Sequence, residues 1–143
     1  MEKIIITNSF EETQKLGLEF AKKVEEVSIL ALYGDLGSGK TTFIQGLAKG
    51  LRINKKIISP TFIIMRSYKV PVIIKKSYFY HIDLYRINDE KDVQELGLIE
   101  LMKDPRNLLA IEWPEKILKL LPEKRLNLHF EYVDENKRKI TIL

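Results

Sequence analysis

Residues 34–41 combine the residue types that are best suited to binding a polyphosphate. Their sequence, Gly-Asp-Leu-Gly-Ser-Gly-Lys-Thr, fits the pattern G-x-x-x-x-G-K-[ST]. The glycines permit tight turns and close approach, so that several backbone N–H groups can converge on an anion. The Lys40 ammonium can reach the outer phosphates, and the Thr41 hydroxyl can bind a magnesium ion. The pattern therefore predicts a phosphate-binding loop.

Such a loop needs a strand in front of it and a helix behind it, and the sequence predicts both. The apolar run 28–33 is typical of a central strand that is covered on both faces. A helix that begins near Lys40 would direct its unpaired N–H groups and its positive dipole end at the anion. Gly50 is predicted to end this helix. Its buried face is predicted to hold apolar residues at helical spacing, namely Phe43, Ile44, Leu47, Ala48 and Leu51.

A magnesium nucleotide site also needs an acid at a strand end near the loop, and two acids compete for this role. Glu112 follows the apolar run 108–111 in the manner of a Walker B strand, although aspartate is the commoner residue there. Asp83 ends a strand that is more aromatic and more polar. Thr61, at the start of another predicted strand, could contact the metal or the γ-phosphate as switch-loop residues do. The residues alone leave the choice between the two acids open.

Three other residues have simpler predicted roles. His81 lies on an alternating strand between Tyr80 and Ile82. We expect that its neighbours orient its side chain and that it does not act as a base. Trp113 is predicted to be an aromatic anchor. No glutamine or arginine is identifiably placed to complete a transition-state charge, and Arg86 is a candidate for that role only by position.

The rest of the chain predicts elements that would surround this site. Residues 3–7 read as a strand, and Ser9 with Glu12 forms a capping box that should start a helix. That helix is predicted to pack through Leu16, Gly17, Phe20, Ala21 and Val24.

The middle and the end of the chain predict two hairpins and several short helices. Residues 61–70 and 77–86 are rich in β-branched and aromatic residues and fit a central β-hairpin. Residues 89–101 suggest two short helices that are separated by Gly97. A buried strand at 107–112 and a short helix at 115–121 follow. The alternating segments 126–130 and 140–142 predict a closing hairpin. The fold class is therefore α/β: a single P-loop-type domain over residues 1–143, with three layers, a mixed β-sheet, a central β-hairpin and a closing C-terminal β-hairpin.

Composition narrows the class of protein. The chain has 143 residues, of which 45% are hydrophobic, enough for one sizeable core. The absence of cysteine excludes disulfides, zinc–thiolate sites and a thiol nucleophile. The net charge of +4 leaves room for an RNA-bearing partner without requiring one. No apolar run approaches a signal peptide or a membrane span, so we expect a soluble, cytoplasmic protein.

Four motifs in fixed order resemble one known family. The motifs are Gly34-Asp-Leu-Gly-Ser-Gly-Lys-Thr-Thr42, Ser59-Pro-Thr-Phe62, His81-Ile-Asp-Leu-Tyr-Arg86 and Glu112-Trp-Pro-Glu115. Together they resemble the TsaE family, also called YjeE, the bacterial ATPases of tRNA threonylcarbamoyladenosine (t6A) synthesis. The resemblance covers nearly the whole chain.

The resemblance implies roles for individual residues. Thr41 and Glu112 would ligate Mg²⁺, Thr61 would lie in a switch-like segment, and Asp83 would stand near the γ-phosphate or its attacking water. Thr13 would approach the adenine, and Lys137 or Arg138 would flank the nucleotide. The residues that would bind ATP in the loop are Gly34, Asp35, Leu36, Gly37, Ser38, Gly39, Lys40, Thr41 and Thr42.

The resemblance also implies partners and leaves three classes of function in view. Members of this family act with the proteins TsaD and TsaB, which make the modified adenosine of tRNA. The main reading is a partner-dependent ATPase with catalytic residues Asp83, Thr61 and Lys40. A small-molecule kinase is the second class, although no insertion is long enough to form a lid and an acceptor pocket. The third class is a module that senses ATP without turnover.

Overall fold

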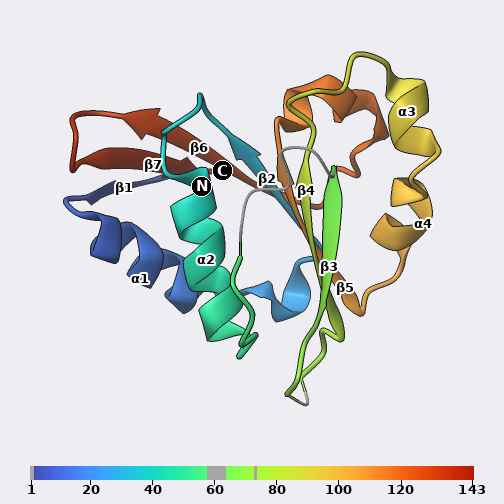
Figure 1. The fold of residues 1–143 in the computed structure, drawn as a ribbon, viewed down its shortest axis with the longest axis horizontal. Coiled ribbons are helices and arrows are strands. Elements are labelled where there is room, and N and C mark those ends of the chain that lie inside the picture. Colours follow the sequence, from blue (N-terminus) through green and yellow to red (C-terminus); the bar gives the residue numbers. More distant parts are fainter. Residues whose placement is uncertain (1, 58–63, 73) are drawn as a thin grey trace.

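The computed structural model describes residues 2–57, 64–72 and 74–143, whose strands form one mixed sheet (Figure 1). The strand order is β1-β7-β6-β2-β5-β4-β3. The predicted Thr61, with the rest of residues 58–63, lies outside the described residues. The strands are β1 (Lys3–Thr7), β2 (Ile29–Tyr33), β3 (Met65–Lys69), β4 (Tyr78–Asp83), β5 (Asn107–Glu112), β6 (Leu126–Tyr132) and β7 (Arg138–Ile142).

The centre of the sheet is parallel and its two edges are antiparallel. Strand β2 pairs in parallel with β5 on one side and with β6 on the other, and β4 pairs in parallel with β5. Strand β3 pairs antiparallel with β4, and β7 pairs antiparallel with both β6 and β1. The mixed sheet, the central hairpin β3–β4 and the closing hairpin β6–β7 are thus confirmed.

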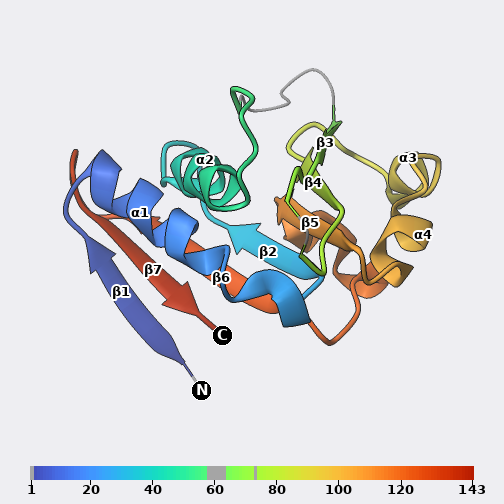
Figure 2. The same ribbon diagram turned by 90° about the horizontal axis from the view of Figure 1, so that it is seen from below.

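Helices cover both faces of the sheet and give the predicted three layers. Helices α1 (Phe10–Phe20) and α2 (Lys40–Gly50) lie together on one face (Figure 2). Helices α3 (Glu90–Gln94) and α4 (Leu98–Lys103) and the 3₁₀ segment η2 (Pro114–Leu120) border a second core on the other face. A further 3₁₀ turn, η1 (Val24–Glu26), links α1 to β2. Each face of β2 and β5 is buried, as their continuous apolar sequences predict.

Helices α1 and α2 approach each other closely because glycines lie at their crossing. A Cβ atom added to Gly17 would lie 2.0 Å from the carbonyl oxygen of Phe43, and one added to Gly46 would lie 1.8 Å from that of Gln14. At Gly50 the nearest atoms would be the Ala21 Cβ at 2.5 Å and the Leu18 carbonyl oxygen at 2.6 Å. Backbone therefore packs against backbone along this helix pair.

The start of α1 has the Ser9 half of the predicted capping box, whereas the Glu12 side chain bonds to a side chain rather than to a backbone N–H. The Ser9 Oγ accepts a hydrogen bond from the Glu12 backbone N–H at 3.1 Å. The Glu12 carboxylate in turn accepts a hydrogen bond from the Asn8 side chain at 3.5 Å. The cap fixes the first turn of α1, which carries Thr13.

Several element boundaries differ from the predictions. Helix α2 includes Gly50, and the left-handed residue beyond its end is Arg52, with φ of 65°. Gly50 is the last residue of α2, so the predicted end of this helix is confirmed, and Gly50 also packs closely against α1. Helix α1 ends at Phe20, so the predicted core residue Val24 belongs to the next turn. The segment after β5 is 3₁₀ and is kinked at Ile117, and the hairpin strands β3 and β4 are shorter than predicted.

Among the described helices, none is long and apolar enough to span a membrane.

Candidate functional site

The loop between β2 and α2 has the geometry that the glycine pattern predicts. Gly39 adopts a left-handed conformation, with φ of 103°, and is the N-cap of α2. A Cβ atom at Gly34 would lie 2.6 Å from the Phe130 carbonyl oxygen, so the loop passes close to β6. Glycine is required at both positions because any other residue would strain the backbone or collide with it. The loop therefore enters α2 directly after a tight turn.

The start of α2 offers polar groups that suit an anion. Gly39 gives the first N–H groups of α2 no side-chain cap. The Ser38 side chain is buried, and its Oγ has no hydrogen-bond partner among the described residues. Uncapped amides at a helix N-terminus favour negative charge. The loop and the helix start thus fit the phosphates of a nucleotide.

Lys40, the first residue of α2, is buried and touches both the loop and β5. Its ammonium donates a hydrogen bond to the Gly34 carbonyl oxygen and lies 4.3 Å from the centre of the Trp113 ring. Burial lowers the pKa of the Lys40 ammonium below its ordinary value, and the negative charges of Glu112 and Asp83 oppose this shift. The ammonium therefore lies within the electrostatic reach of both candidate acids.

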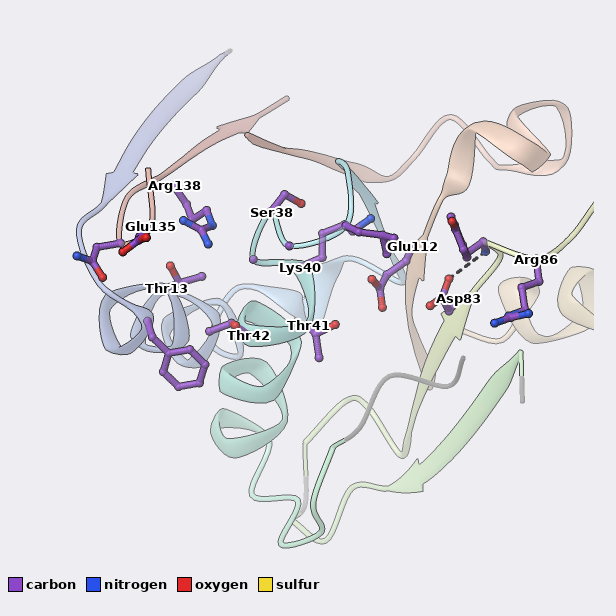
Figure 3. Close-up of a pocket in the computed structure, with 16 residues that line it drawn as sticks. Thr13, Ser38, Lys40, Thr41, Thr42, Asp83, Arg86, Glu112, Glu135 and Arg138 are labelled. Atoms are coloured by element: carbon purple, nitrogen blue, oxygen red, sulfur yellow. Dashed lines mark hydrogen bonds between the residues drawn. The ribbon is translucent and has the colours of Figure 1, made fainter. Parts of the chain in front are cut away.

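The two candidate acids lie side by side at the ends of neighbouring strands. Asp83 ends β4, Glu112 ends β5, and the two are paired in the register of these strands. Both are buried, Asp83 to 8% exposure and Glu112 to 3%. Figure 3 shows them next to Lys40 and Thr41 at the start of α2. The carboxyl ends of parallel strands thus bring together the residues that the sequence singled out as separate motifs.

Each acid has a distinct hydrogen-bond partner. The Asp83 Oδ1 accepts a hydrogen bond from the Tyr85 backbone N–H at 3.0 Å (Figure 3). The Glu112 Oε2 lies 2.6 Å from the Nε2 of His81, which is completely buried. The prediction that neighbours orient His81 is confirmed, because its ring is enclosed and bonded to Glu112. Sequence reasoning missed this contact, since the two residues lie on different strands.

A cavity of about 570 Å³ connects these groups with the start of α1 and the closing hairpin. At one end lie Asp83, Arg86 and Glu112, and at the other lie Thr13, Glu135 and Arg138 (Figure 3). The remaining lining residues include Phe10, Leu36, Gly37, Ser38, Gly39, Lys40, Thr41, Thr42, Tyr85 and Asn136. The volume is that of an ordinary small-molecule site.

The far end of the cavity contains both predicted and unpredicted residues. Thr13 is buried and its Oγ1 shares a 2.7 Å hydrogen bond with the Thr7 hydroxyl. Arg138 lines the cavity, whereas the alternative Lys137 does not. The Arg138 guanidinium lies 4.6 Å from the Tyr132 ring centre, and its Nε is buried without a hydrogen-bond partner among the described residues. Phe10, Glu135 and Asn136 also line the cavity, although no motif marked them as site residues.

The donors present fit Mg²⁺ held together with phosphates rather than a metal enclosed by protein. Among the described residues, no group of three or more histidine, cysteine, aspartate or glutamate side chains could hold a metal ion. Magnesium usually takes one or two protein oxygens and completes its shell with phosphates and water. Thr41 and Glu112 would supply such oxygens, and both line the cavity.

Trp113 adopts an uncommon backbone conformation directly after Glu112. Its φ of 59° and ψ of 47° place it in the left-handed region, which is costly for a bulky residue. Its ring lies 5.2 Å from the Tyr85 ring, centre to centre, and below the Lys40 ammonium. Trp113 is therefore an aromatic anchor, as predicted, and it anchors the lysine of the loop.

A buried parallel strand, a glycine loop and a helix that starts at the loop lysine define a P-loop domain. The sequence profile of one family, described as threonylcarbamoyl adenosine biosynthesis protein TsaE, matches residues 7–140. The chain belongs to the TsaE family.

Individual relatives agree with this assignment. The chain is 38% identical to the tRNA threonylcarbamoyladenosine biosynthesis protein TsaE of Rickettsia felis over 141 residues, which cover 98% of this chain and 79% of that protein. It is 37% identical to the TsaE protein of Bacillus subtilis, with 92% of this chain and 78% of that protein covered. The crystal structure of B. subtilis YdiB superposes with a TM-score of 0.79 at 27% identity, covering 99% of this chain and 84% of that one. The α/β fold is thereby confirmed.

Proposed function

We propose that this protein binds ATP with Mg²⁺ and hydrolyses it in support of tRNA t6A modification, together with TsaD and TsaB. The observation that carries the proposal is the convergence of Lys40, Thr41, Glu112 and Asp83 on one cavity at the start of α2. Family membership supports the link to t6A, because the relatives are named for that biosynthesis. A cytoplasmic location is consistent with work on tRNA.

The cavity residues divide the work of phosphate binding by their chemistry. The loop amides and the start of α2 would bind the phosphates, and Lys40 would exchange its contact with the Gly34 carbonyl for a phosphate oxygen. Thr41 and Glu112 would hold Mg²⁺, which when bound neutralises charge on the phosphates. The cavity extends from there to Thr13 and Arg138, where the nucleoside would lie.

The remaining acid, Asp83, would serve the attacking water. In hydrolysis, a water oxygen bonds to the γ-phosphorus, the bond to the bridging oxygen breaks, and ADP leaves. Asp83 lies beside Glu112 in the strand register and has one oxygen fixed by the Tyr85 N–H. This position supports a role in which its carboxylate would orient a water and accept its proton, while Glu112 would hold the metal. Thr61, which lies outside the described residues, is proposed to complete the site from a switch-like segment.

Phosphate release is the measurement that tests this function. The purified chain is assayed with and without Mg²⁺, with and without TsaD and TsaB, and with a panel of small hydroxyl acceptors. We expect Mg²⁺-dependent release of phosphate that the partners increase and the acceptors leave unchanged. Transfer of phosphate to an acceptor would instead show a kinase. Tight binding of ATP without release under any condition would show a sensing module.

A further inference from the structure

The contact between His81 and Glu112 joins the middle of β4 to the end of β5. The side chain of His81 is completely buried, and that of Glu112 is 4% exposed. The His81 Nε2 lies 2.6 Å from the Glu112 Oε2. A carboxylate that binds a metal ion is deprotonated and can only accept hydrogen bonds. If Glu112 holds the metal ion of the proposed function, the Nε2 of His81 is the donor in this hydrogen bond.

The fold gives the imidazole little freedom to leave this position. His81 lies within β4, between Ala110 of β5 and Arg66 of β3 in the strand register. Its Nδ1 is buried and has no hydrogen-bond partner among the described residues. Among the described residues, the polar contact of this ring is therefore its hydrogen bond to the Glu112 carboxylate. A glutamate side chain has several rotatable bonds, and a fixed donor on one oxygen removes most of that freedom.

We propose that His81 is a positioning residue for the magnesium site. It holds Glu112 in the orientation in which the carboxylate lies beside Thr41 and Lys40. The inference rests on the proposed function, because Glu112 is the metal ligand only if the cavity binds a magnesium nucleotide. Hydrogen-bonded partners of this kind commonly change metal affinity by about 10- to 100-fold when they are removed.

Three variants separate positioning from simple packing. His81→Leu removes the donor and retains an apolar side chain, whereas His81→Gln keeps an N–H donor at similar reach. Phe79→Leu is the matched control, because Phe79 is equally buried two residues earlier on β4 and faces the same core without a hydrogen bond to Glu112. Calorimetry of a non-hydrolysable ATP analogue, repeated over a range of Mg²⁺ concentrations, gives the Mg²⁺ concentration of half-maximal binding for each variant.

We expect His81→Leu to raise that Mg²⁺ concentration by about tenfold or more. We expect His81→Gln to restore it most of the way to the wild-type value. Phe79→Leu should lower thermal stability and leave the Mg²⁺ requirement unchanged. Binding of the analogue in the presence of a chelator should be the same in all four proteins, because the loop amides and Lys40 do not depend on His81.

A nuclear magnetic resonance measurement tests the contact without metal or nucleotide. The chain has only two histidines, so the imidazole nitrogens of His81 are assigned by comparison with a His129→Gln variant. We expect the His81 Nε2 to carry a slowly exchanging proton, and we expect its resonance to shift in Glu112→Ala. A His81 ring protonated only on Nδ1, or a spectrum unaffected by Glu112→Ala, contradicts the proposal even if the His81→Leu protein fails to fold.

The failure of this inference differs from the failure of the proposed function. If the wild-type chain binds the analogue with Mg²⁺ dependence and His81→Leu has the same dependence, then His81 is a packing residue and the function stands. If the wild-type chain shows no Mg²⁺ dependence at all, then the magnesium site is wrong and the positioning role is wrong with it.

Discussion

Lys40 is held by two contacts that a phosphate would replace. Its ammonium donates to the Gly34 carbonyl oxygen and lies over the Trp113 ring. Burial lowers the pKa of the Lys40 ammonium, and the charges of Glu112 and Asp83 oppose this shift. A bound polyphosphate would add further negative charge beside this buried ammonium.

Lys40→Ala is therefore expected to weaken ATP binding and to leave the fold intact. Losing a charge-assisted contact costs about 1.5–3 kcal/mol, or roughly ten- to a hundredfold in affinity. Titration with a fluorescent ATP analogue measures the loss, and circular dichroism checks the fold. Lys49→Ala is the control, because Lys49 is an exposed lysine of the same helix that bonds to Gln14. Equal affinities for the two variants would contradict the role of Lys40.

Trp113 should report on the position of Lys40. It is the only tryptophan of the chain, and the Lys40 ammonium lies 4.3 Å from its ring centre. If Lys40 moves to the phosphates, the ring loses a neighbouring charge, and its fluorescence should change on addition of Mg²⁺ and ATP. The change should be much smaller in Lys40→Ala. A constant spectrum, with binding shown by calorimetry, would mean that Lys40 stays over the ring.

At the scale of elements, the local parts of the site were predictable and the contacts between elements were not. The loop, its strand and its helix are contiguous in sequence, so the local pattern of residues 28–50 is enough to predict this strand–loop–helix unit. The central hairpin follows from two segments that are rich in β-branched and aromatic residues, and the closing hairpin follows from two alternating segments. The pairing of His81 with Glu112 depends on β4 and β5 being neighbours, which no pattern within either strand encodes.

The packing contacts and kinks of helices were also not predictable from local sequence patterns. Gly50 ends α2, as its residue type predicts, but it also packs against Leu18 and Ala21, which no local pattern indicates. The segment after Pro114 has a helical pattern, but Ile117 departs from helical angles and η2 is kinked there. Kinks and close helix contacts depend on what packs against the helix, so periodicity alone could not place them.

The crossing of α1 and α2 gives a prediction for stability. In Gly46→Ala the added Cβ would lie 1.8 Å from the Gln14 carbonyl oxygen, so the helices must move apart. We expect a loss of about 1–3 kcal/mol in the free energy of unfolding, because overpacking a rigid contact forces backbone shifts. Chemical denaturation measures it.

Gly37→Ala is the control for the Gly46→Ala variant. A Cβ at Gly37 would meet no atom within 4 Å, although its φ of 78° adds local strain. We expect a smaller loss of stability for Gly37→Ala than for Gly46→Ala. The reverse order would show that α1 and α2 tolerate separation at their crossing.

At the scale of the whole molecule, charge is distributed unevenly along the chain. Residues 36–82 contain nine lysines or arginines and no aspartate or glutamate, although the net charge is only +4. This acid-free segment includes α2, β3 and most of β4, and its end is marked by Asp83. The carboxylates of the candidate site therefore come from the border of this segment and from β5. Of the nine basic residues, Lys40 lines the cavity, whereas Lys75 pairs with Glu26.

The same whole-molecule view predicts slow hydrolysis by the isolated chain. The sequence identifies no arginine or glutamine as the group that completes the transition-state charge, and among the described residues the arginines that line the cavity are Arg86 and Arg138. Related switch NTPases gain about 10³- to 10⁵-fold when such a group arrives, which equals roughly 4–7 kcal/mol of barrier. We therefore expect TsaD and TsaB to accelerate phosphate release strongly. A fast lone enzyme would contradict this expectation.

Variants of the two acids, Glu112 and Asp83, should then have different defects. Glu112→Ala should weaken Mg²⁺-dependent ATP binding, because it removes the proposed metal ligand, which contacts His81. Asp83→Ala should retain binding and lose the stimulated turnover, because its carboxylate is the group proposed to serve the attacking water. Nucleotide titrations and steady-state hydrolysis on both variants, with and without TsaD and TsaB, separate the two defects. Identical defects would mean that the neighbouring carboxylates of β4 and β5 act as one metal-binding pair rather than as a ligand and a base.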